Sequence, residues 1–141
     1  MNYTGVGVIV ENQEGKFLLH LRDGNTAKFT NQWSLIGGAI ENNEDAIACA
    51  VREVQEEAGL TLQAPSFIGD LKHNDRSIAL VRGVVHTDQE ALVVNEGADF
   101  KFFTKTEAEE LINSSNYSNP YLEQFLLFLK TQCPTDTTKL V

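Results

Sequence analysis

The chain has 141 residues, 42% hydrophobic and 22% charged, so it can build the core of one domain, and disorder throughout is excluded. It carries 20 acidic against 11 basic side chains, which gives a formal net charge of −9. This charge repels phosphate backbones and anionic lipid surfaces, so we expect neither polymeric nucleic acid nor a membrane as a partner. A small phosphorylated ligand is compatible with the charge if a divalent metal accompanies it.

Cysteine usage and the first residues indicate a cytoplasmic protein. Cys49 and Cys133 lie far apart and form no Cys-x-x-Cys pair, which fits a reducing compartment and argues against a disulfide scaffold or a structural zinc site. Residues 1–4 lack the basic patch and the apolar stretch of a signal peptide. No apolar run approaches the roughly 18 residues that a membrane span requires.

The first third of the chain is predicted to contain a hairpin and a further short strand. Alternating valines at 6–10 and the apolar segment 16–21, joined by the turn 12–15, predict the two strands of the hairpin. The polar stretch 23–32 is expected to form a surface loop. Residues 33–36 predict a short strand that ends at the pair Gly37-Gly38.

A long amphipathic helix follows. Helical periodicity runs from Asn43 to Ala58, and Gly59 is expected to end the helix in a left-handed conformation. The apolar stripe that should face the core comprises Ile47, Ala50, Val51, Val54 and Ala58.

The remaining chain predicts three strands and two helices. We expect the strands at 66–72, 77–86 and 100–103. Thr106 and Glu109 form a capping-box pattern for a short helix that continues to Ile112. Asn119-Pro120 opens the last helix, and its buried face is expected to comprise Leu122, Phe125, Leu126 and Leu129.

This order of elements predicts a fold of the α/β (α+β) class, with a mixed sheet covered by helices on its two faces. We expect one domain over residues 1–132. The segment 133–141 is polar and is expected to be a loose C-terminal tail.

Three glutamates of the long helix are the first candidates for a functional site. Glu53, Glu56 and Glu57 stand at positions i, i+3 and i+4, so their carboxylates converge on one side of the helix. A hard divalent cation would remove their mutual repulsion, and oxygen ligands favour magnesium or manganese over zinc. Taken alone, an acidic helix face is more often simply solvated.

The double glycine before the helix is the second candidate feature. Glycine permits a close approach of the backbone, so the carbonyl and amide groups of Gly37-Gly38 can point at a ligand. Taken alone, two adjacent glycines more often form a turn. The glycines and the acidic helix together are typical of a site that binds a metal and a phosphate.

The joint spacing of these residues resembles the signature of the Nudix hydrolases. Residues 38–60 match the pattern G-x5-E-x7-R-E-U-x-E-E-x-G-U, in which U is a bulky aliphatic residue, at every fixed position. Trp33 and the segment 96–103 also look like family features, and the resemblance covers roughly residues 3–130. Ile36 departs from it, since many members carry proline there. The resemblance implies the Nudix fold, a mixed sheet sandwiched between helices in a single domain.

The resemblance also implies a metal site. By analogy, Glu56 and Glu57 are the principal ligands of Mg²⁺, for which Mn²⁺ can substitute. Glu53 shares the metal or its water, and the carbonyl group of Gly38 completes the coordination.

Further roles follow from the same resemblance. Arg52 and Glu44 look supportive, with Arg52 holding a glutamate in place, and Glu41 could join the metal through a water molecule. Two residues are candidates for the general base, namely Glu53 and, from the loop after the sheet, Glu96.

Residues outside the signature are candidates for substrate binding. Arg22 could contact a phosphate, and Phe29 and Trp33 could stack on a base. Two of these residues have a structural alternative: Arg22 could simply lie on the surface, and Trp33 could anchor the core. Cys49 is expected to be inert. No ligand-like spacing connects the histidines, which are expected to be structural or exposed: His20, His73 and His86.

The activity implied by the resemblance is Mg²⁺-dependent hydrolysis of a nucleoside diphosphate derivative. The first hypothesis is a (deoxy)nucleoside triphosphate that yields monophosphate and pyrophosphate, because markers of other subfamilies are absent. The alternatives are a nucleotide sugar or dinucleoside polyphosphate as substrate, or a non-catalytic module that senses nucleotides. The intact set Glu53, Glu56 and Glu57 argues against the sensor. A homodimer is compatible with the sequence.

Overall fold

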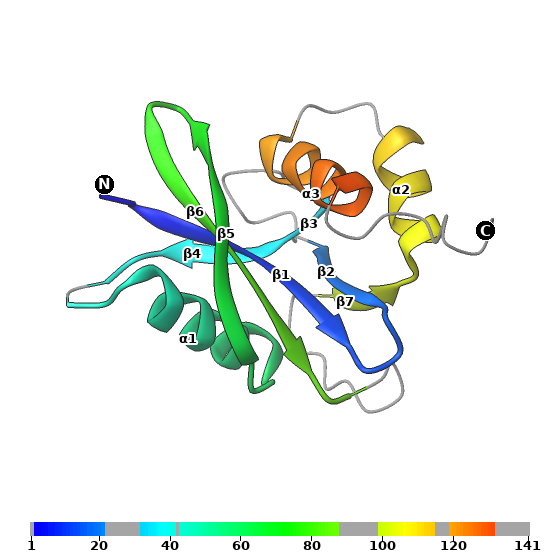
Figure 1. Cartoon of the computed structure of the whole chain (residues 1–141), viewed down its shortest axis with the longest axis horizontal. Helices are drawn as coiled ribbons and strands as arrows, with labels where there is room; N and C mark the ends of the chain where they lie inside the picture. The colour runs from blue at the N-terminus through cyan, green and yellow to red at the C-terminus, as the bar shows by residue number, and fades with distance from the viewer. Residues whose placement is uncertain (1, 22–31, 42, 88–98, 115–118, 132–141) are drawn as a thin grey trace.

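Seven strands form one mixed sheet, and helices pack on both of its sides (Figure 1). The computed structural model describes residues 2–21, 32–41, 43–87, 99–114 and 119–131, and the fold is given for these residues. The strands are β1 (Gly5–Asn12), β2 (Phe17–Leu21), β3 (Trp33–Ser34), β4 (Ile36–Ala39), β5 (Gln63–His73), β6 (Arg76–Val85) and β7 (Asp99–Phe103). The helices are α1 (Ala46–Ala58), α2 (Lys105–Ser114) and α3 (Pro120–Thr131).

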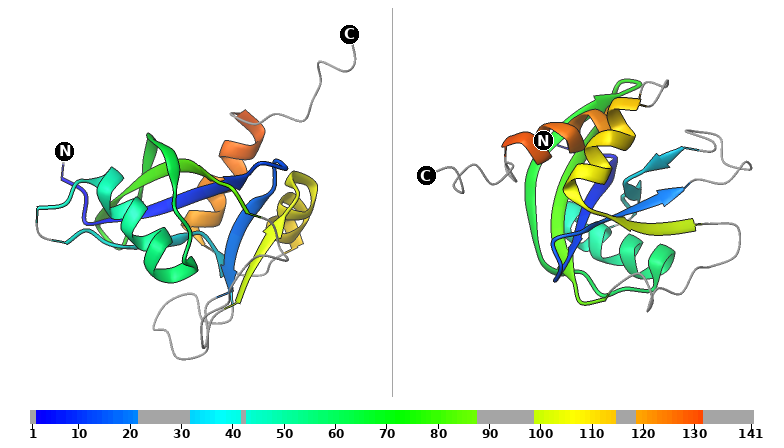
Figure 2. Two further views of the ribbon diagram at one scale, coloured as in Figure 1. Left: turned by 90° about the horizontal axis from the view of Figure 1, so that it is seen from below. Right: turned by 90° about the vertical axis from the view of Figure 1, so that its right-hand side faces the viewer.

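Strand β1 is the centre of the sheet because both of its edges are paired. One edge pairs in parallel with β6 from Gly5 to Asn12. The other edge changes partner midway, pairing with β4 from Gly5 to Val8 and with β2 at Val10 and Glu11. Strands β3 and β7 extend the sheet from β2, and β5 borders β6. As a result β2, β3 and β7 diverge from the other strands, as the right-hand view of Figure 2 shows.

Two hydrophobic cores lie on the two faces of the sheet. In β1, Val6, Val8 and Val10 belong to the core beneath α1, whereas Ile9 belongs to the core beneath α3. A strand that is covered on both faces carries apolar residues on both of them, which explains the apolar run from Val6 to Val10 in β1. Helix α3 buries Leu122, Phe125, Phe128 and Leu129. The predicted mixed sheet between helices is therefore confirmed.

The ends of the helices partly confirm the predictions from the sequence. Gly59 ends α1 with a φ of 70°, as expected, and its N–H donates to the carbonyl of Gln55. The helix begins later than Asn43, because the Asp45 carboxylate accepts a hydrogen bond from the N–H of Ala48 and caps the first turn. Asn119 caps α3 through its side-chain oxygen, which accepts from the N–H of Tyr121 at 2.9 Å.

The capping box predicted for the short helix is wrong. The pair that forms it is Thr104 and Glu107, whose side chains each accept from the backbone N–H of the other at 3.1 and 2.9 Å. The predicted pair at 106 and 109 lies inside α2. On α3, Phe128 takes the buried position that was expected for Leu126.

The position of the two glycines in the fold also differs from the prediction. Gly37 and Gly38 lie inside β4, paired with Gly7 and Val6 of β1, and not in a loop beyond the strand. The carbonyl and amide groups at this position are therefore held by a strand.

Some predictions concern residues outside the described ranges. These are the surface loop, apart from Gln32, and the C-terminal tail 133–141 with its domain boundary. In the described part of the chain, none of the helices combines the length and the apolar character that crossing a bilayer requires.

Candidate active site

Helix α1 and strand β4 bring the first two predicted site residues together. The Glu53 side chain lies against the backbone of Gly38, and a Cβ at position 38 would overlap its carboxylate. Only 12% of the Glu53 side chain is exposed, so this carboxylate is held in a confined position. The absence of a side chain at Gly38 is thus what allows a carboxylate of α1 to reach the strand.

Arg52 forms a bidentate pair with Glu44. Its Nε donates to Glu44 Oε2 at 2.6 Å and its Nη2 to Glu44 Oε1 at 2.9 Å. These bonds, with a further bond from the backbone N–H of Glu41, lower the pKa of Glu44 to about 2. The pKa of Arg52 is raised in turn, chiefly through its hydrogen bonds to Glu44. Both groups are therefore charged at every pH at which the protein would work.

The same guanidinium group reaches three further carboxylates. Its Nη1 lies 3.0 Å from Glu56 Oε1, 3.4 Å from Glu53 Oε2 and 3.7 Å from Glu41 Oε2. A single cation thus offsets part of the repulsion among the acidic side chains of α1 and of the preceding loop. The crowding of these carboxylates therefore does not by itself require a metal ion.

Arg52 also connects α1 to the end of β4. Its Nη2 donates to the carbonyl oxygen of Ala39 at 3.0 Å. Within the intervening loop, the N–H of Glu44 donates to the carbonyl of Glu41 at 3.1 Å. Glu44 and Arg52 therefore hold the segment that joins the glycine strand to the acidic helix.

Glu57 has a partner that the sequence did not reveal. His20 Nδ1 of β2 lies 3.5 Å from Glu57 Oε1, and the imidazole ring stacks on Phe100 with centroids 4.5 Å apart. The histidine was expected to be structural or exposed, and it lies at the site because β2 diverges from β4 toward α1. Only this long-range arrangement identifies it, since no sequence spacing connects residues 20 and 57.

The donor atoms at the site suit a hard divalent cation. All of them are oxygens, from the carboxylates of Glu53, Glu56 and Glu57. Within the described residues, no three acidic, histidine or cysteine side chains already converge as ligands. Glu53 and Glu56 turn to Arg52, and Glu57 turns to His20. The Glu56 side chain is 57% exposed, so it can rotate away from Arg52 without leaving a buried space.

The remaining predicted residues fall into two groups. Arg22, Phe29 and Glu96 lie outside the described ranges. Trp33 is half-buried and packs edge-to-face on Phe103 at 5.3 Å, in agreement with its alternative role as a core anchor. Cys49 is buried beneath Arg52, and burial raises the pKa of its thiol to about 12, so it has no thiolate character near neutral pH.

Comparison with known protein families identifies the family of the chain. The NUDIX domain family matches residues 1–125, and the chain belongs to this family. The predicted Nudix resemblance, the fold and the enzyme class are therefore confirmed.

Several solved structures share the fold. A MutT protein from Methanosarcina mazei Go1 superposes with a TM-score of 0.69 at 20% identity, over 94% of this chain and 96% of that one. A hydrolase of the NUDIX family from Clostridium perfringens has a TM-score of 0.64 at 18% identity, over 92% and 98%. The E. coli ORF135 protein has a TM-score of 0.60 at 25% identity, over 94% and 93%.

One curated relative is similar in sequence. It is the m7GpppN-mRNA hydrolase NUDT17 of Xenopus laevis, 40% identical over 64 residues. The match covers 45% of this chain but 22% of the relative's length, so most of that protein has no counterpart in the aligned segment.

Proposed function

We propose that the protein is a Mg²⁺-dependent pyrophosphohydrolase whose substrate is a (deoxy)nucleoside triphosphate. The observation that carries the proposal is the confined contact between Glu53 and Gly38, next to an arginine that connects four glutamates to the end of β4. An enzyme of this class needs carboxylate oxygens and a backbone carbonyl presented together on rigid elements. Membership of the NUDIX family supports the same reading.

Four groups would hold the metal in this proposal. They are the carboxylates of Glu53, Glu56 and Glu57 and the carbonyl of Gly38, with Glu41 in reach through a water molecule. When bound, Mg²⁺ supplies charge neutralisation for the phosphates and polarises the attacking water.

The chain's own residues then have distinct tasks. Arg52 and Glu44 keep the loop before α1 in place, and His20 holds the Glu57 carboxylate from the side of β2. In the reaction, the oxygen of water bonds to phosphorus, the bridging P–O bond breaks, and monophosphate and pyrophosphate leave. The proton of the water passes to a general base, for which Glu53 and Glu96 remain the two candidates.

A second candidate substrate is a nucleotide joined through phosphates to another group, such as a nucleotide sugar or a dinucleoside polyphosphate. The similarity to an m7GpppN-mRNA hydrolase supports this alternative, because a cap contains two nucleosides linked by phosphates. A nucleotide-sensing module without turnover is the third reading.

A panel of nucleotides tests these alternatives. Each compound is incubated with Mg²⁺, and the products are separated by ion-exchange chromatography. The proposal expects monophosphate and pyrophosphate from triphosphates, and Glu57→Gln should lower the rate by about 10²-fold or more while the circular dichroism spectrum is unchanged. The exposed Glu110 of α2 supplies a matched control, Glu110→Gln, which should retain wild-type activity.

The outcomes separate the three readings. Turnover of only the linked dinucleotides or nucleotide sugars would replace the first substrate hypothesis with the second. Tight nucleotide binding without turnover of any compound would favour the sensor. Near-wild-type activity of Glu57→Gln would remove Glu57 from the site.

Other properties of the protein stay predictions. The cytoplasmic location rests on the cysteine usage of the sequence, and the domain limits 1–132 and 133–141 rest on its composition. A homodimer remains an expectation that sedimentation can check.

A further inference from the structure

The outer edge of strand β5 is open. In the described part of the chain, β5 is the last strand of its sheet and pairs with β6 alone. The right-hand view of Figure 2 places it at the margin of the sheet, away from β2 and β7. An edge of this kind presents backbone N–H and C=O groups to another strand. The edge of β5 is therefore a surface that can bind an extended segment.

Only the second half of β5 is regular enough to accept a partner strand. The register with β6 shifts twice before Gly69, whose φ of 153° marks the second shift. From Gly69 to His73 the pairing is continuous, and it ends in the turn 74–75. Because bulges twist a strand and interrupt its edge, the segment that remains available is 69–73.

The turn determines which backbone groups of this segment point outward. Both residues of the turn 74–75 have positive φ, 50° and 64°, as in the type I′ turn of a two-residue hairpin. In such a hairpin the flanking residues, here His73 and Arg76, exchange hydrogen bonds, and bonded and open positions alternate along the strand. The N–H and C=O groups of Asp70 and Lys72 are therefore the ones that point away from β6.

The side chains of these two residues carry opposite charges. Asp70 and Lys72 are exposed and lie on the face of β5 opposite to Leu71, which is buried in the core beneath α3. The Tyr3 hydroxyl donates a hydrogen bond to the Asp70 carboxylate at 2.9 Å, which fixes that carboxylate at the edge. The whole chain has a net charge of −9, whereas the segment 69–76 carries two acidic and two basic side chains. Two copies of the chain therefore repel each other least through this segment.

We propose that the open edge of β5 pairs with the same edge of a second copy of the chain, in an antiparallel two-fold dimer. When the pairing is centred on Leu71, Asp70 of each copy lies directly opposite Lys72 of the other. Opposite charges in facing positions stabilise an antiparallel pair, and Asp70 and Lys72 also exchange backbone hydrogen bonds there. A pairing centred on Asp70 or on Lys72 would place like charges face to face, so the charges select one register.

An exposed aromatic side chain on the same face supports a second copy as the partner. Phe67 is 50% exposed and packs against Tyr3, with the ring centroids 5.7 Å apart. In the proposed register, the turn 74–75 of the second copy comes next to Phe67, so the pairing also covers part of this aromatic surface. Because the paired segment is short, the dimer should be weak, with a dissociation constant on the order of 10–100 µM.

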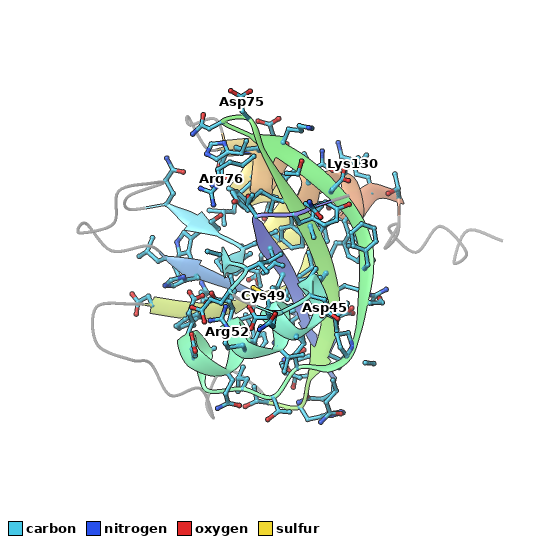
Figure 3. All side chains as sticks on the ribbon, turned by 90° about the vertical axis from the view of Figure 1, so that its left-hand side faces the viewer. Asp45, Cys49, Arg52, Asp75, Arg76 and Lys130 are labelled. Carbon is cyan, nitrogen blue, oxygen red and sulfur yellow. The ribbon has the colours of Figure 1, made fainter. Side chains whose placement is uncertain are left out.

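This edge is separate from the proposed site of hydrolysis. Figure 3 shows Asp75, at the tip of the β5–β6 hairpin, well away from Arg52 beside α1. Substitutions at Asp70 and Lys72 should therefore leave the rate of hydrolysis unchanged. The dimer can be tested whether or not the proposed function holds.

Sedimentation equilibrium between about 10 µM and 1 mM measures the self-association. Asp70→Lys and Lys72→Glu should each raise the dissociation constant about tenfold, because each then places like charges opposite one another at both facing positions. An equimolar mixture of the two variants should associate about as strongly as the wild type, since each chain supplies the charge that the other lacks. Lys130→Glu, at an exposed position of α3, is the matched control for net charge and should leave the association unchanged.

Amide hydrogen exchange locates the interface. The outward N–H groups of Asp70 and Lys72 should become protected as the protein concentration rises, whereas the N–H of Leu71 faces β6 and should not change. A chain that stays monomeric up to about 1 mM would overturn the inference, and so would a dimer that leaves these amides unprotected. The inference would also fail if the charge reversals had no effect, if Lys130→Glu weakened the dimer equally, or if the mixture did not associate.

A different occupant of the edge would also be visible in the same experiment. Protection of the Asp70 and Lys72 amides by an added extended peptide, without self-association of the chain, would assign the edge to another protein. That result would equally overturn the proposed dimer.

Discussion

Alanine at position 38 should impair catalysis with little effect on folding, whereas alanine at position 37 should impair folding. Both glycines lie in β4 and both face close neighbours. At Gly38 the neighbour is the carboxylate of Glu53, which is the end of a flexible side chain. At Gly37 the neighbour is the carbonyl oxygen of Val6, which belongs to the central strand and cannot turn aside.

The changes in stability that the two substitutions cause can be estimated from these contacts. A change from glycine to alanine in a compatible conformation stabilises a protein by about 0.4–1 kcal/mol, through the unfolded chain. Overpacking against a fixed neighbour costs about 1–3 kcal/mol. Gly37→Ala should therefore lose about 1–2 kcal/mol, a fall in Tm of roughly 3–8 °C for a chain of this size. Gly38→Ala should lose less stability than Gly37→Ala, because the atoms that the new Cβ meets are the end of a side chain and not backbone.

The loss of catalytic activity should instead be larger for Gly38→Ala than for Gly37→Ala. Displacing the Glu53 carboxylate moves a group that the proposed reaction needs, and a misplacement of about 1 Å can cost about 10²-fold in rate. Gly38→Ala should accordingly lose about 10²-fold in kcat/KM for the preferred triphosphate. Gly37→Ala should keep activity much closer to the wild type at temperatures at which it is folded.

Thermal and urea denaturation measure the first effect, and steady-state hydrolysis with Mg²⁺ at 20 °C measures the second. Wild-type activity in Gly38→Ala would refute the reasoning, because Glu53 would then not need its position against β4. A larger loss of stability in Gly38→Ala than in Gly37→Ala would refute the assignment of which neighbour can move.

Two further predictions concern the partners of the acidic residues. Bonding in the folded protein lowers the pKa of Glu44 from 4.5 to about 2, so the stabilisation it provides is fully present above pH 4.5 and is lost as the pH falls to 2. The difference in urea midpoint between wild type and Glu44→Gln should shrink across this window, and a constant difference would contradict the prediction. His20→Ala should weaken Mn²⁺ binding about tenfold in titrations followed by electron paramagnetic resonance, with partial recovery in His20→Gln. Unchanged affinity, or an equal loss in the exposed control His86→Ala, would show that His20 does not position Glu57.

The sequence predicts the acidic helix well because its signals are local. The spacing of Glu53 and Glu57 places both on one side of any helix, and the left-handed conformation of Gly59 follows from its position after the last apolar residue. The same locality explains the wrong capping box. Thr104 and Thr106 both precede a glutamate by three residues, and the end of β7 at Phe103 decides which of them begins the helix.

Contacts between distant segments could not be predicted in this way. His20 meets Glu57 because β2 leaves the edge of β1 where β4 ends its pairing, and Arg52 meets Ala39 because β4 runs beneath α1. Likewise, no spacing in the sequence predicts that Arg76 of the β5–β6 hairpin and Gly38 of β4 line the same cavity.

The amino-acid sequence by itself therefore determined the family and the helix with its carboxylates. It also determined the alternating pattern by which successive side chains of β1 enter the two different cores. The tertiary structure alone decided that His20 lies beside Glu57 and which residues line the cavity beside β4. The reason is that helical periodicity depends on neighbours three or four residues away, whereas these contacts depend on the register of strands far apart in the chain.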